Sequence, residues 1–375
     1  MLISVILFAI GLILLIKGGD WVVDGATGIA KRFRLPDIVV GATVVSIGTT
    51  LPEVMVSTTG ALAGSGAMAY GNAIGSIICN TALIAAISIT CNPGPVNVKS
   101  LKTPAIFFFC SAALYCVASY FLGEFPRWMG ILMLTVFVVY MVLTVRNGLK
   151  NPDSAAEEEE EDEDGNGKGI WGEVALLAAC AVGIAVLSSL VTGILMVVAF
   201  AAYTFLKVKP AKEGGKSLIE ELLFLIIGAA VIAGGADFLV EHGQIIAIGL
   251  GVPETVVALL FVALGTSLPE LVTTITSLKK GRASLGVGNV IGANVFKLVL
   301  VSGVAVSLAP FEVPFTKLLD TGLNMSLVIE IPVMLGVMSL MIFPAMLKKK
   351  LGRWQGIVLL GIYAAFVVCQ FVLSR

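Results

Sequence analysis

Long apolar runs separated by short polar segments dominate the pattern of hydrophobic and polar positions along the chain. A helix needs about 20 mostly apolar residues to cross roughly 30 Å of hydrocarbon. The first run begins at the N-terminus without a basic leader or a small-residue cleavage pattern, so we expect a retained span and not a signal peptide. Ten runs near the required length predict transmembrane helices at residues 3–24, 38–62, 69–92, 104–122, 127–145, 218–240, 255–278, 287–309, 326–346 and 355–373.

A further apolar stretch, residues 171–206, is 36 residues long. One straight helix of that length would measure about 54 Å at 1.5 Å per residue. Such a helix is too long to cross the bilayer without extreme tilt. We therefore predict an additional transmembrane hairpin that turns near Ser188 and Ser189, which brings the number of spans to twelve.

The positions of the basic residues agree with twelve spans. Nineteen of the 24 Lys and Arg residues then fall on one side of the membrane and three on the other, while Lys17 and Lys297 lie inside spans. Because Lys and Arg concentrate in cytoplasmic loops, this distribution predicts a protein of the cell (inner) membrane with both termini outside. A single span at 171–206 would send three basic loops to the opposite face and destroy the bias.

The composition restricts the function classes. Hydrophobic residues make up 58% of the chain and charged residues 13%, against about a quarter charged in soluble domains. The net charge of −1 and the lack of a basic stripe give no sign of a nucleic-acid partner. The six cysteines have no Cys-x-x-Cys spacing, so the sequence indicates neither a disulfide framework nor a zinc site. Nucleotide-binding loops, redox motifs and nucleophile constellations are also lacking, so we expect no enzyme and no cofactor.

Two segments, residues 35–80 and 252–297, resemble each other without a gap. A separation of 217 positions relates Pro36 to Pro253, Gly48-Thr49 to Gly265-Thr266, Leu51-Pro52-Glu53 to Leu268-Pro269-Glu270, Gly71-Asn72 to Gly288-Asn289, and Ile74-Gly75 to Ile291-Gly292. Matches that keep register over two spans indicate duplication. Equivalent helices lie seven steps apart in the predicted order of spans (38–62 is the second and 255–278 the ninth), and because this offset is odd the two copies have opposite orientation. Inverted repeats of this kind bind ions near the midplane, where the copies meet.

The fold class that follows is an all-α polytopic membrane protein. It consists of an inverted-topology repeat of five-helix halves, which form a ten-helix core, plus the extra transmembrane hairpin. Residues 1–149 form the first transmembrane half and residues 218–375 the second. Residues 150–217 hold a cytoplasmic acidic linker and the hairpin.

Each repeat places a glutamate, Glu53 or Glu270, near the middle of an apolar span. The proline before each glutamate lacks an N–H, which frees the carbonyls of Gly48 and Gly265. Thr49 lies four residues before Glu53 and shares its helix face, as Thr266 does with Glu270. Hydroxyls, carbonyls and carboxylates together make the oxygen-rich site that calcium favours. Two carboxylates facing each other in hydrocarbon repel, so a cation or a proton must accompany them.

The next helix of each copy carries a second polar face. In the first copy Ser76 and Asn80 lie four residues apart and offer oxygens to an ion, whereas Ala293 and Lys297 hold the equivalent positions in the second copy.

The segments GATVVSIGTTLPEVMVS…GNAIGSIICN and VALLFVALGTSLPELVT…GNVIGANVFK resemble the alpha repeats of the calcium/cation antiporter superfamily, sodium/calcium exchanger branch. The resemblance implies exchange of calcium against sodium by alternating access, with four ion positions in a diamond around the two glutamates. It also implies a set of metal ligands. These are the side chains of Thr49, Thr50, Glu53, Ser76, Asn80, Thr266, Ser267 and Glu270, with the backbone carbonyls of Ser46 and Ala263.

Two residues depart from the family pattern and are expected to modulate the site. Ala293 stands where a serine hydroxyl is usual, and Lys297 stands where an aspartate or asparagine is usual. Lys297 puts a cation beside the glutamates, or it snorkels to the interface. The lysine also makes a second function possible, a proton-coupled calcium/cation antiporter in which Lys297 or a glutamate carries the proton. A passive cation channel or a membrane sensor is the alternative of a different class.

Two further groups of charged residues have a functional and a structural interpretation. Asp162, Asp164, Asn166 and Glu173 match positions 1, 3, 5 and 12 of an EF-hand calcium loop. They lie in or after an acidic run that is also typical of a solvated linker. The other group either draws cations toward the two membrane faces or caps helices at the interface, and consists of Asp20, Asp24, Asp237 and Glu241.

Overall fold

The computed structural model describes residues 2–33, 35–150, 218–249, 265, 267–315 and 323–373. The predicted hairpin at 171–206 and most of the linker between the two halves lie outside these residues, as does the start of the predicted span 255–278. The candidate calcium loop with Asp162, Asp164, Asn166 and Glu173 lies outside them too.

The described part of the first half is almost entirely helical. Short π-helical turns (η) lie within two of its spans without breaking the helical path, and a third ends the span that α6 begins. Its elements are α1 (Leu2–Arg32), α2 (Asp37–Val40), η1 (Gly41–Val45), α3 (Ser46–Leu62), α4 (Gly66–Cys79), η2 (Asn80–Ala85), α5 (Ala86–Cys91), β1 (Gly94–Pro95), α6 (Val98–Cys116), η3 (Val117–Leu122), β2 (Glu124–Phe125) and α7 (Arg127–Lys150).

The second half repeats this order of elements. It contains α10 (Leu218–Gly249), α12 (Leu268–Lys279), α13 (Ala283–Phe296), η4 (Lys297–Val301), α14 (Ser302–Leu308), β3 (Phe311–Glu312), η6 (Ser326–Glu330), α15 (Ile331–Lys348), β4 (Lys350–Leu351) and α16 (Arg353–Leu373). In the described chain, seven helices are long and apolar enough to cross a membrane. The prediction of an all-α polytopic membrane protein is therefore confirmed.

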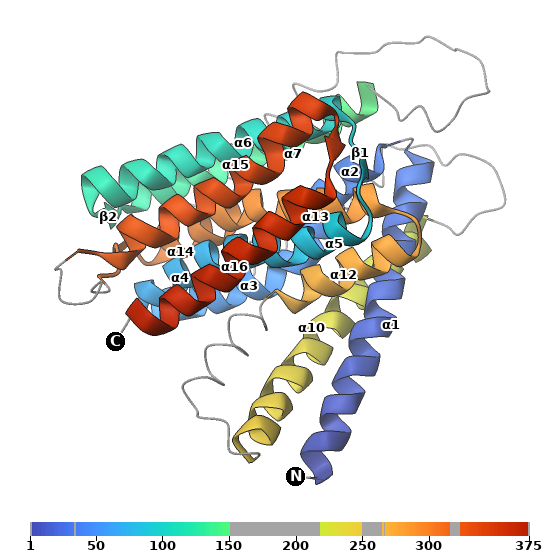
Figure 1. Cartoon of the computed structure of the whole chain (residues 1–375), viewed down its shortest axis with the longest axis horizontal. Helices are drawn as coiled ribbons and strands as arrows, with labels where there is room; N and C mark the ends of the chain where they lie inside the picture. The colour runs from blue at the N-terminus through green and yellow to red at the C-terminus, as the bar shows by residue number, and fades with distance from the viewer. Residues whose placement is uncertain are drawn as a thin grey trace.

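Helices α1 and α10 begin the two halves, and they pack against each other in antiparallel fashion through glycines (Figure 1). A Cβ atom on Gly18 would lie 2.8 Å from the carbonyl oxygen of Gly228, and one on Gly235 would lie 2.9 Å from that of Gly11. Gly11 and Gly228 are 217 positions apart, as are Gly18 and Gly235. The contacting pairs are thus exchanged by the repeat, and the equivalent helices run in opposite directions.

Two miniature antiparallel strand pairs follow the same symmetry. β1 pairs with β4 through Gly94 and Leu351, and β2 pairs with β3 through Glu124 and Glu312. β1 and β3 hold equivalent positions in the two copies, since 217 residues separate Gly94 from Phe311. The labels β1 and β2 lie at opposite ends of the helix bundle in Figure 1. Each copy therefore contributes one strand to each end.

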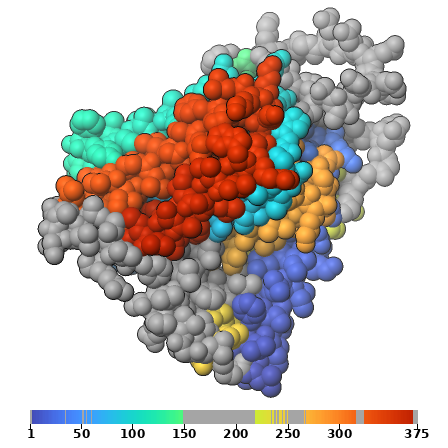
Figure 2. Space-filling model, viewed as in Figure 1, coloured from blue at the N-terminus to red at the C-terminus, as the bar shows by residue number. Residues whose placement is uncertain are grey.

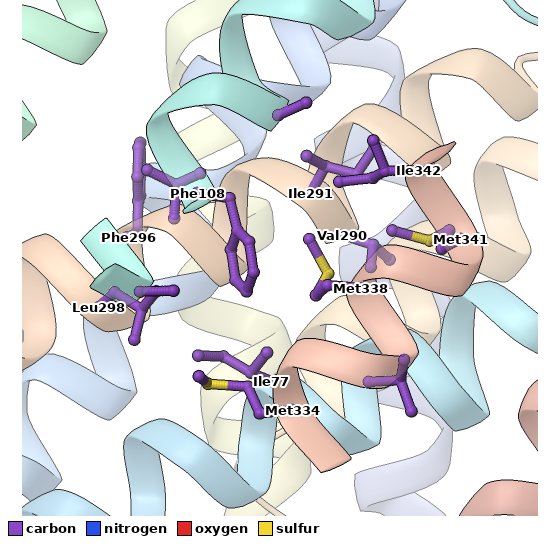
Figure 3. Close-up of a cluster of buried hydrophobic side chains, with 14 of the residues drawn as sticks. Ile77, Phe108, Val290, Ile291, Phe296, Leu298, Met334, Met338, Met341 and Ile342 are labelled. Carbon is purple, nitrogen blue, oxygen red and sulfur yellow. The ribbon is translucent and has the colours of Figure 1, made fainter. Parts of the chain in front are cut away.

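Helix α13 lies at the centre of the bundle, with every residue from Leu285 to Phe296 buried. Figure 3 shows Val290 and Ile291 of α13 beside Met338 and Met341 of α15. On the outside, α15 and α16 cover one face of the bundle (Figure 2). Their outer side chains are large and apolar, as expected of a surface in contact with lipid.

Candidate ion-binding site

Three charged side chains meet in the interior of the bundle. Glu53 comes from α3, Glu270 from the first turn of α12, and Lys297 from the first residue of η4. None of the three is exposed to solvent. The Nζ atom of Lys297 lies 3.2 Å from Oε1 of Glu53 and 3.2 Å from Oε1 of Glu270. The structure therefore brings the two repeat glutamates to one point, where an ammonium group bridges them.

Local backbone features place these side chains. Pro269 occupies the first turn of α12, where a missing N–H costs no helical hydrogen bond. The π-helical turn η2 begins at Asn80 and η4 begins at Lys297, which are equivalent positions in the two copies. π-Helical turns of this kind often occur at functional sites because they disturb the regular helical hydrogen bonds. Lys297 lies in mid-helix and does not snorkel to the membrane surface, since its ammonium group is fully buried.

Five of the predicted ligand residues have buried oxygen atoms that lack hydrogen-bond partners within the described part of the chain. This is unusual, because more than 90% of buried polar groups are normally hydrogen-bonded. The atoms concerned are Oγ1 of Thr50, Oδ1 of Asn80, Oγ of Ser267, and the carboxylate oxygens of Glu53 and Glu270, whose Oε1 atoms are engaged by the ion pair with Lys297 and not by a hydrogen bond. All five residues belong to the ligand set that the sequence predicts. Carboxylate, amide and hydroxyl oxygens with free lone pairs are the donors that calcium and sodium take.

The other predicted ligands that the structure describes make hydrogen bonds of their own. The hydroxyl of Thr49 lies 3.3 Å from Oδ1 of Asn289, and the hydroxyl of Ser76 donates to Oδ1 of Asn72 over 3.2 Å. The carbonyl of Ser46 is 3.5 Å from the Thr49 hydroxyl. Ala293 is fully buried and offers no hydroxyl. Thr266 and Ala263 lie outside the described residues.

Sequence reasoning missed three asparagines that surround these ligands. Asn72 and Asn289 contact predicted ligands, as described above, and Asn294 accepts a hydrogen bond from Nδ2 of Asn80 over 3.2 Å. Asn294 in turn donates to Thr81 over 2.7 Å. The repeat already pairs Asn72 with Asn289, so their recurrence was a usable signal. Asn294 has no such signal, because Ile77 holds the equivalent position.

The acidic residues predicted to attract cations or to cap helices are partly engaged in ion pairs. Lys280, just beyond the end of α12, lies 3.4 Å from Asp20 and 2.8 Å from Asp24 of α1. Glu241 is exposed on α10, and the Asp237 side chain is outside the described set. Asp20 and Asp24 therefore join α1 to α12, whatever further effect their charge has on ions.

Comparisons with known proteins place the chain among ion exchangers. The family model described as "Sodium/calcium exchanger protein" matches residues 3–146 and 221–372. The sodium/calcium exchanger MaX1 of Methanosarcina acetivorans is 26% identical, over 98% of this chain and 99% of its own. The inner membrane protein YrbG of Escherichia coli is 27% identical, over 84% of this chain and 82% of its own. A solved structure of the sodium-calcium exchanger NCX_Mj, soaked with sodium and strontium ions, superposes with a TM-score of 0.69 at 26% identity, over 98% of both chains.

Proposed function

The chain belongs to the sodium/calcium exchanger protein family, and from this premise we propose that it exchanges calcium for sodium at the buried site around Glu53 and Glu270. The resemblance carried by the two repeats is confirmed, and with it the class of secondary active cation antiporters. In transporters with inverted repeats, the two copies rock around a site near the midplane and expose it to each side in turn. The individual ligands of the ions are the part that is proposed.

One observation carries this assignment, namely the convergence of Glu53 and Glu270 on the ammonium group of Lys297. One carboxylate comes from each copy of the repeat, so a cation at this point touches both inverted halves. An ammonium group 3.2 Å from two carboxylates marks a position that suits a cation. A metal ion that displaces it would also need neutral ligands, and Thr50 and Ser267, three residues before the two glutamates, have buried hydroxyl oxygens without hydrogen-bond partners in the described chain, as does Oδ1 of Asn80.

We further propose that Lys297 acts as a tethered cation that takes the place of one transported ion. Two glutamates and one lysine sum to −1, so a calcium ion added to this triad would leave a net positive charge in a buried site. Unbalanced buried charge is costly. Calcium binding therefore requires that the ammonium group move aside or lose its proton. The second possibility is the proton-coupled antiporter, and the contact of Lys297 with both glutamates is the observation that favours it.

Transport assays in proteoliposomes separate these mechanisms. We expect an outward sodium gradient to drive calcium uptake, and the variant Glu53→Gln to abolish it. Uptake driven by a pH gradient in the absence of sodium would indicate proton coupling. Calcium flux down its own gradient, with no opposing ion required, would indicate a channel and contradict the proposal.

We also propose that the protein lies in the inner membrane with both termini outside and the acidic segment in the cytoplasm. The basis is the distribution of the basic residues along the chain. Single cysteines at position 166 and near the C-terminus, labelled with an impermeant reagent on intact cells, test this orientation in a background without native cysteines. Labelling at position 166 from outside would overturn it.

A further inference from the structure

Asn289 of α13 lies between the ligand-bearing helices of the two copies. Its Oδ1 atom faces α3, 3.3 Å from the hydroxyl of Thr49, and its Nδ2 atom lies 2.9 Å from the hydroxyl of Thr273 on α12. Asn289, Thr49 and Thr273 are all buried. The side chain therefore joins the helix that carries Glu53 to the helix that carries Glu270.

The close approach of α13 to the first copy explains how Asn289 reaches that far. Glycines precede it and follow it on the same helix. A Cβ atom on Gly288 would lie 2.2 Å from the carbonyl oxygen of Ile38, and one on Gly292 would lie 2.5 Å from that of Ala42. Since no larger residue fits at either position without a shift, the two glycines set the depth at which Asn289 enters the site.

The hydrogen-bond network fixes which way the Asn289 amide points. The Oγ1 atom of Thr273 lies 2.9 Å from the carbonyl oxygen of Pro269 and donates its one hydrogen to that oxygen. Its oxygen is then an acceptor and must face an N–H donor, which is Nδ2 of Asn289. The opposite end of the amide, Oδ1, is consequently presented to α3 as an acceptor.

The Thr49 hydroxyl is the group that uses this acceptor. Ser46 also approaches Oδ1 of Asn289, at 3.3 Å, but its hydroxyl lies closer, at 2.8 Å, to the carbonyl of Gly41. Thr49 has the carbonyl of Ser46 as its other acceptor, at the longer distance of 3.5 Å. The hydrogen of the Thr49 hydroxyl therefore points to Asn289.

We propose that Asn289 is a positioning residue: its Oδ1 atom accepts a hydrogen bond from the Thr49 hydroxyl and thereby turns the lone pairs of that hydroxyl oxygen toward the transported cation. A hydroxyl binds a metal ion only through its lone pairs, so a hydrogen directed at the cation would repel it. This inference rests on the proposed function, in which Thr49 is a ligand. Asn72 has the same task in the first copy, where its Oδ1 accepts from Ser76.

A double-mutant cycle tests this role, because residues that act through one another are not additive. We expect Thr49→Val and Asn289→Leu each to weaken the apparent affinity for sodium or calcium about tenfold. The double variant is expected to lose no more ion affinity than the single variant that shows the larger loss. Independent losses, about a hundredfold together, would contradict the inference, as would unchanged affinity in Asn289→Leu.

A crossed cycle provides the matched control. Ser76→Ala is expected to couple with Asn72→Leu and to be additive with Asn289→Leu, since the structure pairs Ser76 with Asn72. Coupling of Asn289 with Ser76 as strong as with Thr49 would point to a general packing role and overturn the inference.

If Asn289→Leu does not fold, Thr273→Val replaces it, because the Thr273→Val change removes the acceptor that orients the Asn289 amide. The effect of Thr273→Val on ion affinity should then vanish in the Thr49→Val background. If Thr273→Val still weakens ion binding in that background, the inference is refuted.

Failure of the two proposals can be told apart. If Glu53→Gln still transports calcium, the site itself is wrongly assigned. If Glu53→Gln is inactive while the Thr49 and Asn289 effects are additive, the site stands and only the role of Asn289 is refuted.

Discussion

The two copies of the repeat are alike in their carboxylates and differ in the helix that follows. Glu53 and Glu270 both reach the Lys297 ammonium group at 3.2 Å. Beside them, the first copy offers the neutral oxygens of Ser76 and Asn80, whereas the second offers the methyl group of Ala293 and the charge of Lys297. The shared part gives the site two negative charges. The proposed ligands differ between the copies, and on that proposal the unequal part decides how many cations fit, because Ser76 and Asn80 would bind an ion and Lys297 would compete with one.

The largest expected effect comes from removing what the copies share. Glu53→Gln and Glu270→Gln each keep the side-chain shape and remove one of the two negative charges. We expect each variant to abolish gradient-driven calcium flux in proteoliposomes while the protein remains monodisperse in detergent. Glu124→Gln is the matched control, since this glutamate is exposed in β2 and its variant should transport normally. Near-normal flux in either buried-site variant would contradict the assignment.

The next effect comes from making the second copy resemble the first. Lys297→Asn restores the residue that Asn80 provides, and Lys297→Asp adds a carboxylate. Removing an ammonium 3.2 Å from both glutamates should tighten calcium binding at least about tenfold, because charges this close interact by a few kcal/mol even with screening. Lys297→Asp should also raise the number of sodium ions exchanged per calcium.

Calcium-45 binding at several pH values and the reversal potential of sodium-driven flux measure these two consequences. The pH dependence of transport should become flatter once the lysine is gone. Unchanged coupling together with unchanged pH dependence in Lys297→Asp would show that the ammonium group does not compete with the ions. Lys17→Asn, on α1 and away from the triad, serves as the control for losing a lysine inside a span.

A third effect concerns the packing that brings the copies together. Gly288→Ala would place a methyl group 2.2 Å from the carbonyl oxygen of Ile38, so α13 must move away from α2. Overpacking of this kind costs about 1–3 kcal/mol. We expect a lower melting temperature in detergent and weaker ion affinity, because Asn289 moves with the helix. Gly361→Ala is the control: within the described chain, nothing lies within 4 Å of an added Cβ at this exposed position of α16. Equal melting temperatures for the two variants would contradict this account.

The repeat explains why much of the architecture could be predicted from the sequence. Apolar length places the helices, and a constant separation of 217 positions identifies Glu53 and Glu270 as equivalent. Equivalence in an inverted repeat implies that the two residues meet, and they do so around Lys297. The π-helical turns at Asn80 and Lys297 could not be predicted, because they depend on tertiary packing more than on local propensity.

At the site, the direction in which a side chain points could not be predicted from the sequence. The repeat pairs Asn72 with Asn289, but the first accepts from Ser76 on its own helix and the second from Thr49 of the other copy. This difference follows from Ala293, which leaves Asn289 without a serine hydroxyl four residues on, and from the close contact of α13 with the first copy. Such contacts between copies leave no mark in the spacing of one sequence.

The smallest expected effect comes from restoring the hydroxyl that the second copy lacks. Ala293→Ser places an oxygen four residues after Asn289, on the same helix face, as Ser76 stands to Asn72. A carbonyl oxygen accepts two hydrogen bonds, so Asn289 can hold the new hydroxyl without releasing Thr49. The new lone pairs would add one neutral ligand on the side of Lys297, where the buried ammonium group still opposes cations. We therefore expect only about a threefold gain in apparent sodium affinity, measured as the sodium concentration for half-maximal exchange, which corresponds to well under 1.4 kcal/mol. Ser76→Ala should shift it in the opposite direction. A gain as large as that of Lys297→Asn would mean that the missing hydroxyl, and not the lysine, is what sets the second copy apart.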